Sequence, residues 1–270
     1  MFCRDRVKSL VSTALELRKW LVIMGGVIDL VNELKHVDTL VVSYHGVVAT
    51  PVVPRYRAVA DPRVLELFRT LRGKYTVVLA TFRSYSAVAS IAEAFDALLC
   101  CNGCEIVTPD IIVIPRNAEE YTHRVLEISR HLKTSADYVV ELRRTRFGDA
   151  VGLSIEWNGD VKAVSREVIE IAMKMALDRG LRVYCEERAK FVEIYAPICS
   201  RRRALEILRK LLGLGRVAFV SDCFVDAEVA DIVDLFVFVR HELNEGTNLD
   251  AHTIVTRQEL LEALRRIATS

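Results

Sequence analysis

The sequence has almost no net charge and no long apolar segment. Lys and Arg number 37 against 36 acidic residues, which leaves a formal net charge of +1 in 270 residues. A chain with this balance has no overall attraction to nucleic acid or to an anionic membrane, so we expect neither as a partner. The longest apolar run near the N-terminus, residues 20–31, contains two glycines and Asp29 and is too short to span a bilayer. Because no secretory signal is evident either, the sequence predicts a cytoplasmic protein.

Metal-ligand patterns are also scarce. Cys101 and Cys104 form a single CxxC motif, and no second pair or histidine partner stands at the spacing of a zinc site. The alternative to zinc is that the cysteines are buried as small apolar side chains. We expect this for the seven cysteines: Cys3, Cys100, Cys101, Cys104, Cys185, Cys199 and Cys223.

Short apolar runs alternate with helical patterns in the first and last parts of the chain. Asp61 and Pro62 stand where an N-cap and a first helical residue are expected, and residues 256–259 form a capping box. The predicted strands are residues 39–43, 75–80, 97–101, 216–221 and 235–239, and the predicted helices begin near residues 62, 87, 200 and 256. This alternation is typical of an α/β protein with a Rossmann-like parallel sheet and helices on both sheet faces.

The middle of the chain has a different pattern. Residues 152–157 alternate in polarity, as a strand of a half-solvated antiparallel sheet does. The predicted strands here are residues 138–142, 151–157, 182–185 and 191–195, with helices at residues 119–133 and 165–178. We therefore expect three parts: an N-terminal helical extension (1–36), a core (37–106 and 196–270) and an inserted α+β cap domain (107–195). The extension, whose helical pattern covers residues 5–20, either packs on the core or forms a docking surface.

Polar side chains cluster where the predicted parallel strands end. In an open parallel sheet, ligands bind beyond the carboxyl ends of the strands. The segments at these positions are Ser43-Tyr44-His45-Gly46, Thr81-Phe82-Arg83-Ser84, and Ser221-Asp222-Cys223 followed by Asp226. Ser200 and the three arginines 201–203 begin a predicted helix, where backbone N–H groups favour an anion. The alternative is that these arginines point in different directions into solvent.

These segments, in this order, resemble the motifs of the haloacid dehalogenase superfamily of phosphotransferases, whose pattern begins Asp-x-Asp-Gly-Thr. The detail resembles trehalose-6-phosphate phosphatase. "SYHGVVATPVVPRY" resembles that family's "DYDGTLTPIVPDP", "VVLATFRS" its "VSGRS", "CNGCEI" its "NHGAEI", "KFVEIYAP" its "VLEIRP", and "VSDCFVDAEV" its "IGDDRTDED". The resemblance spans about residues 38–268 and implies a haloacid dehalogenase core with a cap that encloses a sugar.

The resemblance assigns roles to individual positions of the core. Ser43 stands where the family has the aspartate nucleophile, which is also a magnesium ligand, and His45 stands where it has the aspartate general acid/base. The positions that bind phosphate in the family are Thr81, Arg83 and Arg201, the last in place of a lysine. The family's acidic metal-binding motif is reduced to Asp222 and Asp226. The alternative for Asp226 is a helix-capping role.

Three positions of the predicted cap correspond to sugar-binding residues of the family. They are Glu141, Arg143 and Glu193. The alternative for Glu141 and Arg143 is an exposed strand face. A histidine of the family is replaced by Glu156, which argues against the same disaccharide as ligand.

The replacements in the core remove groups that the family's chemistry needs. A carboxylate is ionised at pH 7 and can attack phosphorus, whereas a serine hydroxyl needs a base. Magnesium prefers carboxylate oxygens, and a cysteine sulfur is a poor replacement. Loss of one member of a covalent catalytic unit typically lowers the rate by about 10⁴ to 10⁶. We therefore expect a catalytically degenerate protein with no magnesium or only weakly bound magnesium. The alternative is an active sugar-phosphate phosphatase with an altered site.

Ser43 and His45 themselves have three interpretations. Residues i and i+2 of a strand face the same side, so the two side chains could form a new nucleophile and base if a third group oriented the imidazole. They could instead fill a vacated site, or they could help to bind a ligand. The resemblance implies that such a protein either binds a sugar phosphate or acts in trehalose metabolism as a partner or regulatory subunit. Through the family's pathway, the implied partner is a trehalose-6-phosphate synthase.

Overall fold

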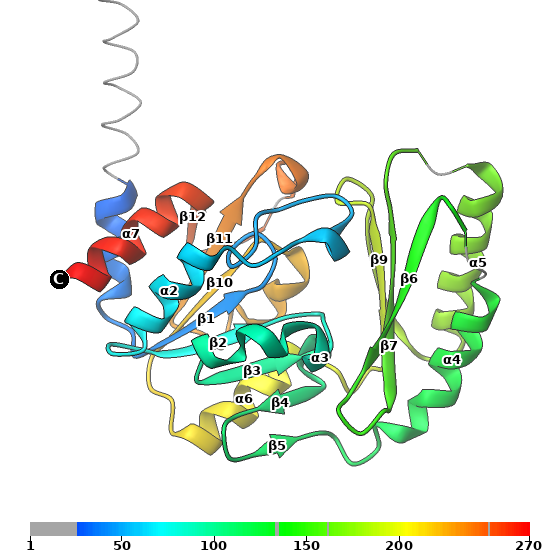
Figure 1. Ribbon diagram of the computed structural model, residues 1–270, viewed down its shortest axis with the longest axis horizontal. Coiled ribbons are helices and arrows are strands. Elements are labelled where there is room, and N and C mark those ends of the chain that lie inside the picture. Colours follow the sequence, from blue (N-terminus) through cyan, green and yellow to red (C-terminus); the bar gives the residue numbers. More distant parts are fainter. Residues whose placement is uncertain (1–25, 133–134, 161, 248) are drawn as a thin grey trace, which may run out of the picture.

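The computed structural model describes residues 26–270 except 133, 134, 161 and 248. Within this part, a core and a smaller cap stand side by side, joined by two crossing segments (Figure 1). The predicted helix at residues 5–20 lies outside the described residues, and so does Cys3; residues 26–34 are helical, as predicted. No helix among the described residues has the length and apolar character to cross a membrane.

The core is built on one eight-stranded sheet with the strand order β12-β11-β10-β1-β2-β3-β4-β5. Its strands are β1 (Thr39–Ser43), β2 (Thr76–Ala80), β3 (Ala97–Cys100), β4 (Glu105–Val107), β5 (Ile112–Val113), β10 (Val217–Ser221), β11 (Leu235–Arg240) and β12 (Thr253–Thr256). All neighbours from β12 to β3 are parallel, and β4 and β5 join antiparallel. The strand order places β1 at the centre, so its carboxyl end lies at the middle of the ligand-binding edge.

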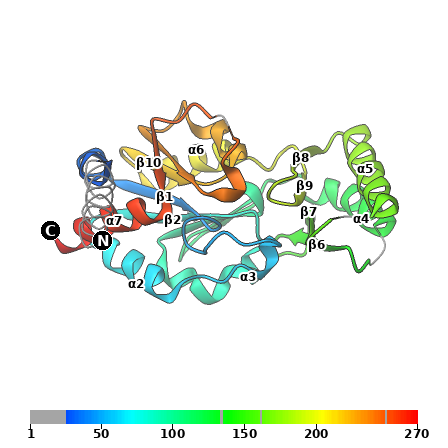
Figure 2. The ribbon, with the colours of Figure 1, turned by 90° about the horizontal axis from the view of Figure 1, so that it is seen from above.

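Helices cover both faces of this sheet (Figure 2). The helices of the core are α2 (Pro62–Leu71), α3 (Tyr85–Val88), α6 (Arg201–Leu212) and α7 (Arg257–Thr269), with short 3₁₀ turns η1 (Arg55–Arg57), η2 (Ala89–Ala94), η3 (Cys101–Gly103), η5 (Phe224–Val229) and η6 (Glu242–Asn244). Alternate residues of β1 pack on opposite faces: Leu40 and Val42 face the layer of α2 and α7, whereas Val41 faces α6. This double burial explains why the strands read as unbroken apolar runs.

The cap is an antiparallel sheet with the order β6-β7-β9-β8, covered on one face by two helices. Its elements are η4 (Glu119–Tyr121), α4 (Thr122–His131), β6 (Tyr138–Arg144), β7 (Ala150–Trp157), α5 (Ala163–Asp178), β8 (Arg182–Glu186) and β9 (Phe191–Tyr195). Leu153, Ile155 and Ile194 pack under the helices. The intervening polar residues, such as Glu156 and Glu193, face the core. The cap sheet therefore presents a polar face toward the carboxyl ends of the core strands.

The predicted α/β core with an inserted α+β cap is confirmed. The local signals behave as predicted: Asp61 caps α2, Ser200 caps α6, and Thr256 with Glu259 forms a capping box on α7. The first core segment was predicted to end at residue 106, but β5, at residues 112–113, pairs with β4 and so belongs to the core sheet. Burial was expected for the cysteines, and Cys100, Cys101, Cys104 and Cys199 are buried. Cys223 is half-buried. The expectation is wrong for Cys185, which is exposed on the edge strand β8.

Candidate functional site

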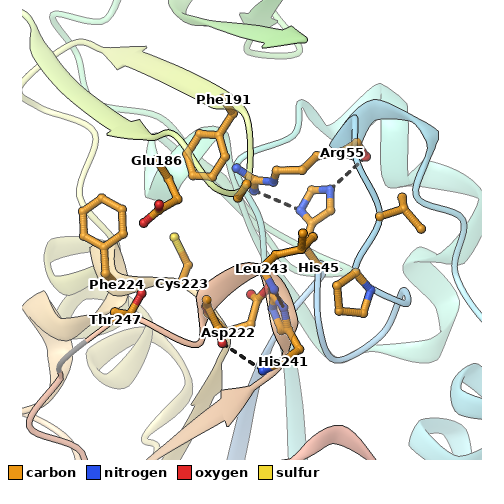
Figure 3. Close-up of a pocket in the computed structure, with 14 residues that line it drawn as sticks. His45, Arg55, Glu186, Phe191, Asp222, Cys223, Phe224, His241, Leu243 and Thr247 are labelled. Carbon is orange, nitrogen blue, oxygen red and sulfur yellow. Dashed lines mark hydrogen bonds and ion pairs between the residues drawn. The ribbon is translucent and has the colours of Figure 1, made fainter. Parts of the chain in front are cut away.

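Two connected cavities lie between the carboxyl ends of the core strands and the cap. The smaller has a volume of about 170 Å³ including the space open to solvent, and it is lined by Ser43, Tyr44, His45, Arg55, Ala80, Thr81, Phe82, Arg201, Asp222 and Cys223. The larger has a volume of about 470 Å³ including its open mouth, and it is lined from both the core and the cap (Figure 3). They share His45, Arg55, Asp222 and Cys223, so one molecule could extend from one into the other. Five predicted site residues meet in the smaller cavity: Ser43, His45, Thr81, Arg201 and Asp222.

Ser43 is buried at the end of β1, with its hydroxyl in the smaller cavity. The hydroxyl donates to the backbone oxygen of His45 at 2.8 Å, and Asp222 Oδ1 lies at 3.4 Å as a second acceptor. Asp222 Oδ2 in turn lies 3.1 Å from Nε2 of His241. The order Ser–Asp–His differs from that of a catalytic triad, in which the histidine contacts the hydroxyl and takes its proton.

His45 is held by Arg55 rather than by Ser43. Its Nδ1 accepts from Nη2 of Arg55 at 3.1 Å, and its Nε2 lies 3.2 Å from the backbone oxygen of the same residue. A guanidinium can only donate, so Nδ1 is the acceptor and Nε2 carries the proton. Burial, together with the positive charge of Arg55, lowers the pKa of His45 well below its ordinary value. The ring is therefore neutral, both of its nitrogens are engaged, and neither is placed to act on Ser43.

Arg201 lies in the smaller cavity at the first turn of α6, paired with a buried carboxylate. Its Nη1 donates to Oδ2 of Asp226, and its guanidinium lies over the Phe82 ring, 4.2 Å from the ring centroid. Ser221 also donates to Asp226 Oδ2. Burial raises the pKa of Asp226, and the positive charge of Arg201 opposes this. The helix-capping alternative for Asp226 is wrong, because the N-cap of η5 is Cys223 and Asp226 lies inside the turn.

The two other predicted phosphate-binding residues have different surroundings. Thr81 lines the smaller cavity, and its Oγ1 accepts from the backbone N–H of Arg83 at 3.1 Å. The Arg83 guanidinium donates to the backbone oxygen of Arg55 at 2.7 Å and lies over the ring of Tyr44. It lines neither cavity, so it supports the Arg55 turn instead of facing a ligand.

The side chains near Ser43 do not form the oxygen set that magnesium prefers. Asp222 is engaged by Ser43 and His241, and Asp226 is covered by the guanidinium of Arg201. Among the described residues, no group of three or more His, Cys, Asp or Glu side chains is placed to hold a metal ion. A guanidinium next to the second carboxylate would repel a divalent cation, so the residues present do not fit bound magnesium.

The three predicted sugar-binding residues lie in one ion-paired cluster between cap and core. Nη1 of Arg143 is 2.6 Å from Glu141, and its Nη2 is 3.4 Å from Glu193. Arg143 and Glu193 are 1% and 0% exposed, which contradicts the alternative of an exposed strand face for Arg143. Burial raises the pKa of Glu193, although Arg143 and Arg55 oppose this. None of the three lines either cavity.

Arg55 and His241 are site residues that the sequence did not indicate. Arg55 links the two domains: Nη1 lies 3.7 Å from Glu193 of the cap, and the guanidinium lies over the ring of Phe191, 4.1 Å from the ring centroid. The adjacent N–H of Tyr56 donates to Glu156 at 2.6 Å. His241 directly follows β11, and its place at a strand end was the available signal. No comparable signal marks Arg55, because its contacts depend on how the cap closes.

Comparisons with solved structures agree with this architecture. A trehalose-6-phosphate phosphatase related protein is 18% identical, with a TM-score of 0.63 over 86% of this chain and 97% of that one. The C-terminal domain of the trehalose-6-phosphate phosphatase of C. albicans is 13% identical, with a TM-score of 0.69 over 90% and 96%. A haloacid dehalogenase-like hydrolase from Bacteroides thetaiotaomicron is 17% identical, with a TM-score of 0.57 over 85% and 99%. Comparison of the sequence with family models and with curated proteins gave no match.

The structural neighbours of this chain are thus phosphatases of the haloacid dehalogenase superfamily, and they match over most of its length. Among them are trehalose-6-phosphate phosphatase-like proteins, as the sequence motifs predicted. At these identities the similarity defines the fold, a haloacid dehalogenase core with a cap. What the site does must be argued from its own residues.

Proposed function

We propose that this chain binds a phosphate monoester in the cavities between core and cap and does not hydrolyse it. The observation that carries the proposal is a pair of buried arginine N–H groups at the smaller cavity. Nη1 of Arg55 and Nε of Arg201 have no hydrogen-bond acceptor among the described residues, and both side chains line this cavity. A buried cationic donor without an acceptor is costly, and phosphate oxygens would supply the missing acceptors. Thr81 and Ser43 add hydroxyl groups to the same wall.

The contacts of Ser43 and His45 support the proposal that the ester is not hydrolysed. An attacking hydroxyl at Ser43 would need a base, and the acceptors within reach are a backbone oxygen and a carboxylate at 3.4 Å that is shared with His241. A leaving alkoxide would need an acid, and the remaining N–H of the neutral His45 ring donates its hydrogen bond to the backbone oxygen of Arg55. The unpaired N–H groups of Arg55 and Arg201 remain available for positioning a phosphate, and these favour binding over turnover.

The proposal is tested by changing only the charge of the cavity. Ser43→Asp restores the family's carboxylate, and Ser43→Asn is the neutral control of nearly equal size. We expect inorganic phosphate to raise the melting temperature of the unmodified protein and of Ser43→Asn, and to bind Ser43→Asp at least about tenfold more weakly without magnesium. Equal binding to the two variants, or no binding to the unmodified protein, would overturn the proposal.

A phosphatase assay with magnesium separates this proposal from the alternative of an active sugar-phosphate phosphatase. Trehalose 6-phosphate is the first ester to assay, because the sequence resembles enzymes that act on it. Magnesium-dependent release of phosphate by the unmodified protein would establish the alternative. Activity gained only in the double variant Ser43→Asp, His45→Asp would support the loss of an ancestral activity. The sugar-phosphate ligand, the synthase partner and the cytoplasmic location stay predictions.

A further inference from the structure

The larger cavity has walls that suit a flat ring better than a sugar. Six apolar side chains line it: Pro51, Val52, Ala189, Phe191, Phe224 and Leu243. The two phenylalanines come from different domains, Phe191 from the cap strand β9 and Phe224 from the core turn η5, and Figure 3 shows Glu186 between them. Aromatic side chains bind flat rings by stacking, without regard to hydroxyl positions.

The polar groups with free acceptor capacity here are the carboxylates of Glu186 and Asp222 and the hydroxyl of Thr247. Glu186 accepts one backbone N–H, from Arg188 at 3.3 Å, and has no cationic partner among the described side chains. Asp222 stands on the opposite, core side of the same cavity. Arg55, the cation of the cavity wall, also lines the smaller cavity, where its free Nη1 is assigned to the phosphate. The larger cavity therefore offers acceptors to N–H donors and offers little to a second anion.

A disaccharide would need many polar partners, and the cap does not present them to this cavity. Its predicted sugar-binding residues are buried in the cluster around Arg143 and line neither cavity. The larger cavity adjoins the phosphate cavity through four shared lining residues.

We propose that the ligand is a phosphate monoester of an aromatic ring that carries N–H donors, as in a nucleoside monophosphate. This inference rests on the proposed function. The phosphate occupies the smaller cavity between Arg55 and Arg201. The ring occupies the larger cavity against Phe191 and Phe224, and its N–H groups donate to Glu186 and Asp222.

The test compares adenosine 5′-monophosphate with ribose 5-phosphate, which lacks only the ring, and with glucose 6-phosphate and inorganic phosphate. We expect calorimetric titration to give a Kd for adenosine 5′-monophosphate at least about tenfold below those of the two sugar phosphates. Glu186→Gln and, independently, Phe224→Ala should each remove most of this advantage and leave ribose 5-phosphate unaffected. Glu187→Gln is the matched control, because Glu187 is the next residue along the chain and its side chain lines a different cavity.

The outcomes distinguish the two proposals. Sugar phosphates that bind as tightly as adenosine 5′-monophosphate would overturn the ring site and leave phosphate binding intact. Equal effects of Glu186→Gln and Glu187→Gln would also overturn it. Binding of adenosine with no gain from its phosphate would support the ring site and overturn the proposed function.

Discussion

His45 makes the stability of this protein depend on pH in a direction that can be calculated. The ring is buried, and the charges that face it, on Arg55, Arg83 and Arg143, are all positive. Its pKa in the folded protein is therefore well below the ordinary value of 6.5, which applies to the unfolded chain. Below pH 6.5 the unfolded chain binds a proton that the folded protein does not bind. The contribution to stability is thus fully present above pH 6.5 and is lost as the pH falls.

The size of this loss follows from linkage. One histidine that stays neutral in the folded state costs about 1.4 kcal/mol of unfolding free energy between pH 7.5 and pH 5.5. The variant His45→Gln removes the titration and keeps a side chain that can accept from Arg55 and donate to its backbone oxygen. Urea unfolding of both proteins at the two pH values measures the difference, and every other titrating group cancels in the comparison. The wild type should lose about 1.4 kcal/mol more than the variant on acidification. An equal loss, or a smaller loss in the wild type, would refute a neutral His45 held by Arg55.

Two further predictions concern packing around the cavities, and both are measured as unfolding free energies. Glu193→Ala removes a buried carboxylate that pairs with the buried Arg143 and should cost about 3–5 kcal/mol. Glu141→Ala removes a half-exposed partner of the same arginine and should cost about 1 kcal/mol or less. Equal costs would contradict the buried cluster. Gly46→Ala places a Cβ 2.4 Å from the side chain of Asp222, whereas Gly180→Ala has the same φ of +71° and meets nothing within 4 Å. The first should therefore cost about 1–3 kcal/mol more than the second, and similar costs would show that Asp222 does not pack against Gly46.

Local patterns predicted most of the fold. The strand β1 was predicted to its exact bounds, and the caps at Asp61, Ser200 and Thr256 were predicted from short-range chemistry alone. These features depend on neighbouring residues and on burial on both faces of a parallel sheet. The alternation of strands and helices predicts parallel strands, whose carboxyl ends lie at one edge of the sheet, and the predicted residues Ser43, Thr81 and Asp222 do lie together there.

The pairing of the site residues could not be predicted in the same way. Arg201 contacts Asp226, and His45 contacts Arg55, through a three-dimensional arrangement that no spacing in the sequence encodes. Arg143 and Glu193 looked like residues that face a ligand, and they are buried because the polar face of the cap closes on the core. These contacts leave Arg143 and Glu193 paired with each other instead of facing a ligand, which the identities of the residues alone did not indicate.

The central claim is that the site binds a phosphate monoester and leaves it intact, and ³¹P NMR tests both parts in one sample. The protein is mixed with adenosine 5′-monophosphate and magnesium, and the ester and inorganic phosphate signals are followed over a day, with Ser43→Asp as the matched variant. We predict that the unmodified protein broadens or shifts the ester signal and releases no inorganic phosphate. An ester signal that is unchanged by the protein, or a steady magnesium-dependent growth of the inorganic phosphate signal, would contradict the claim.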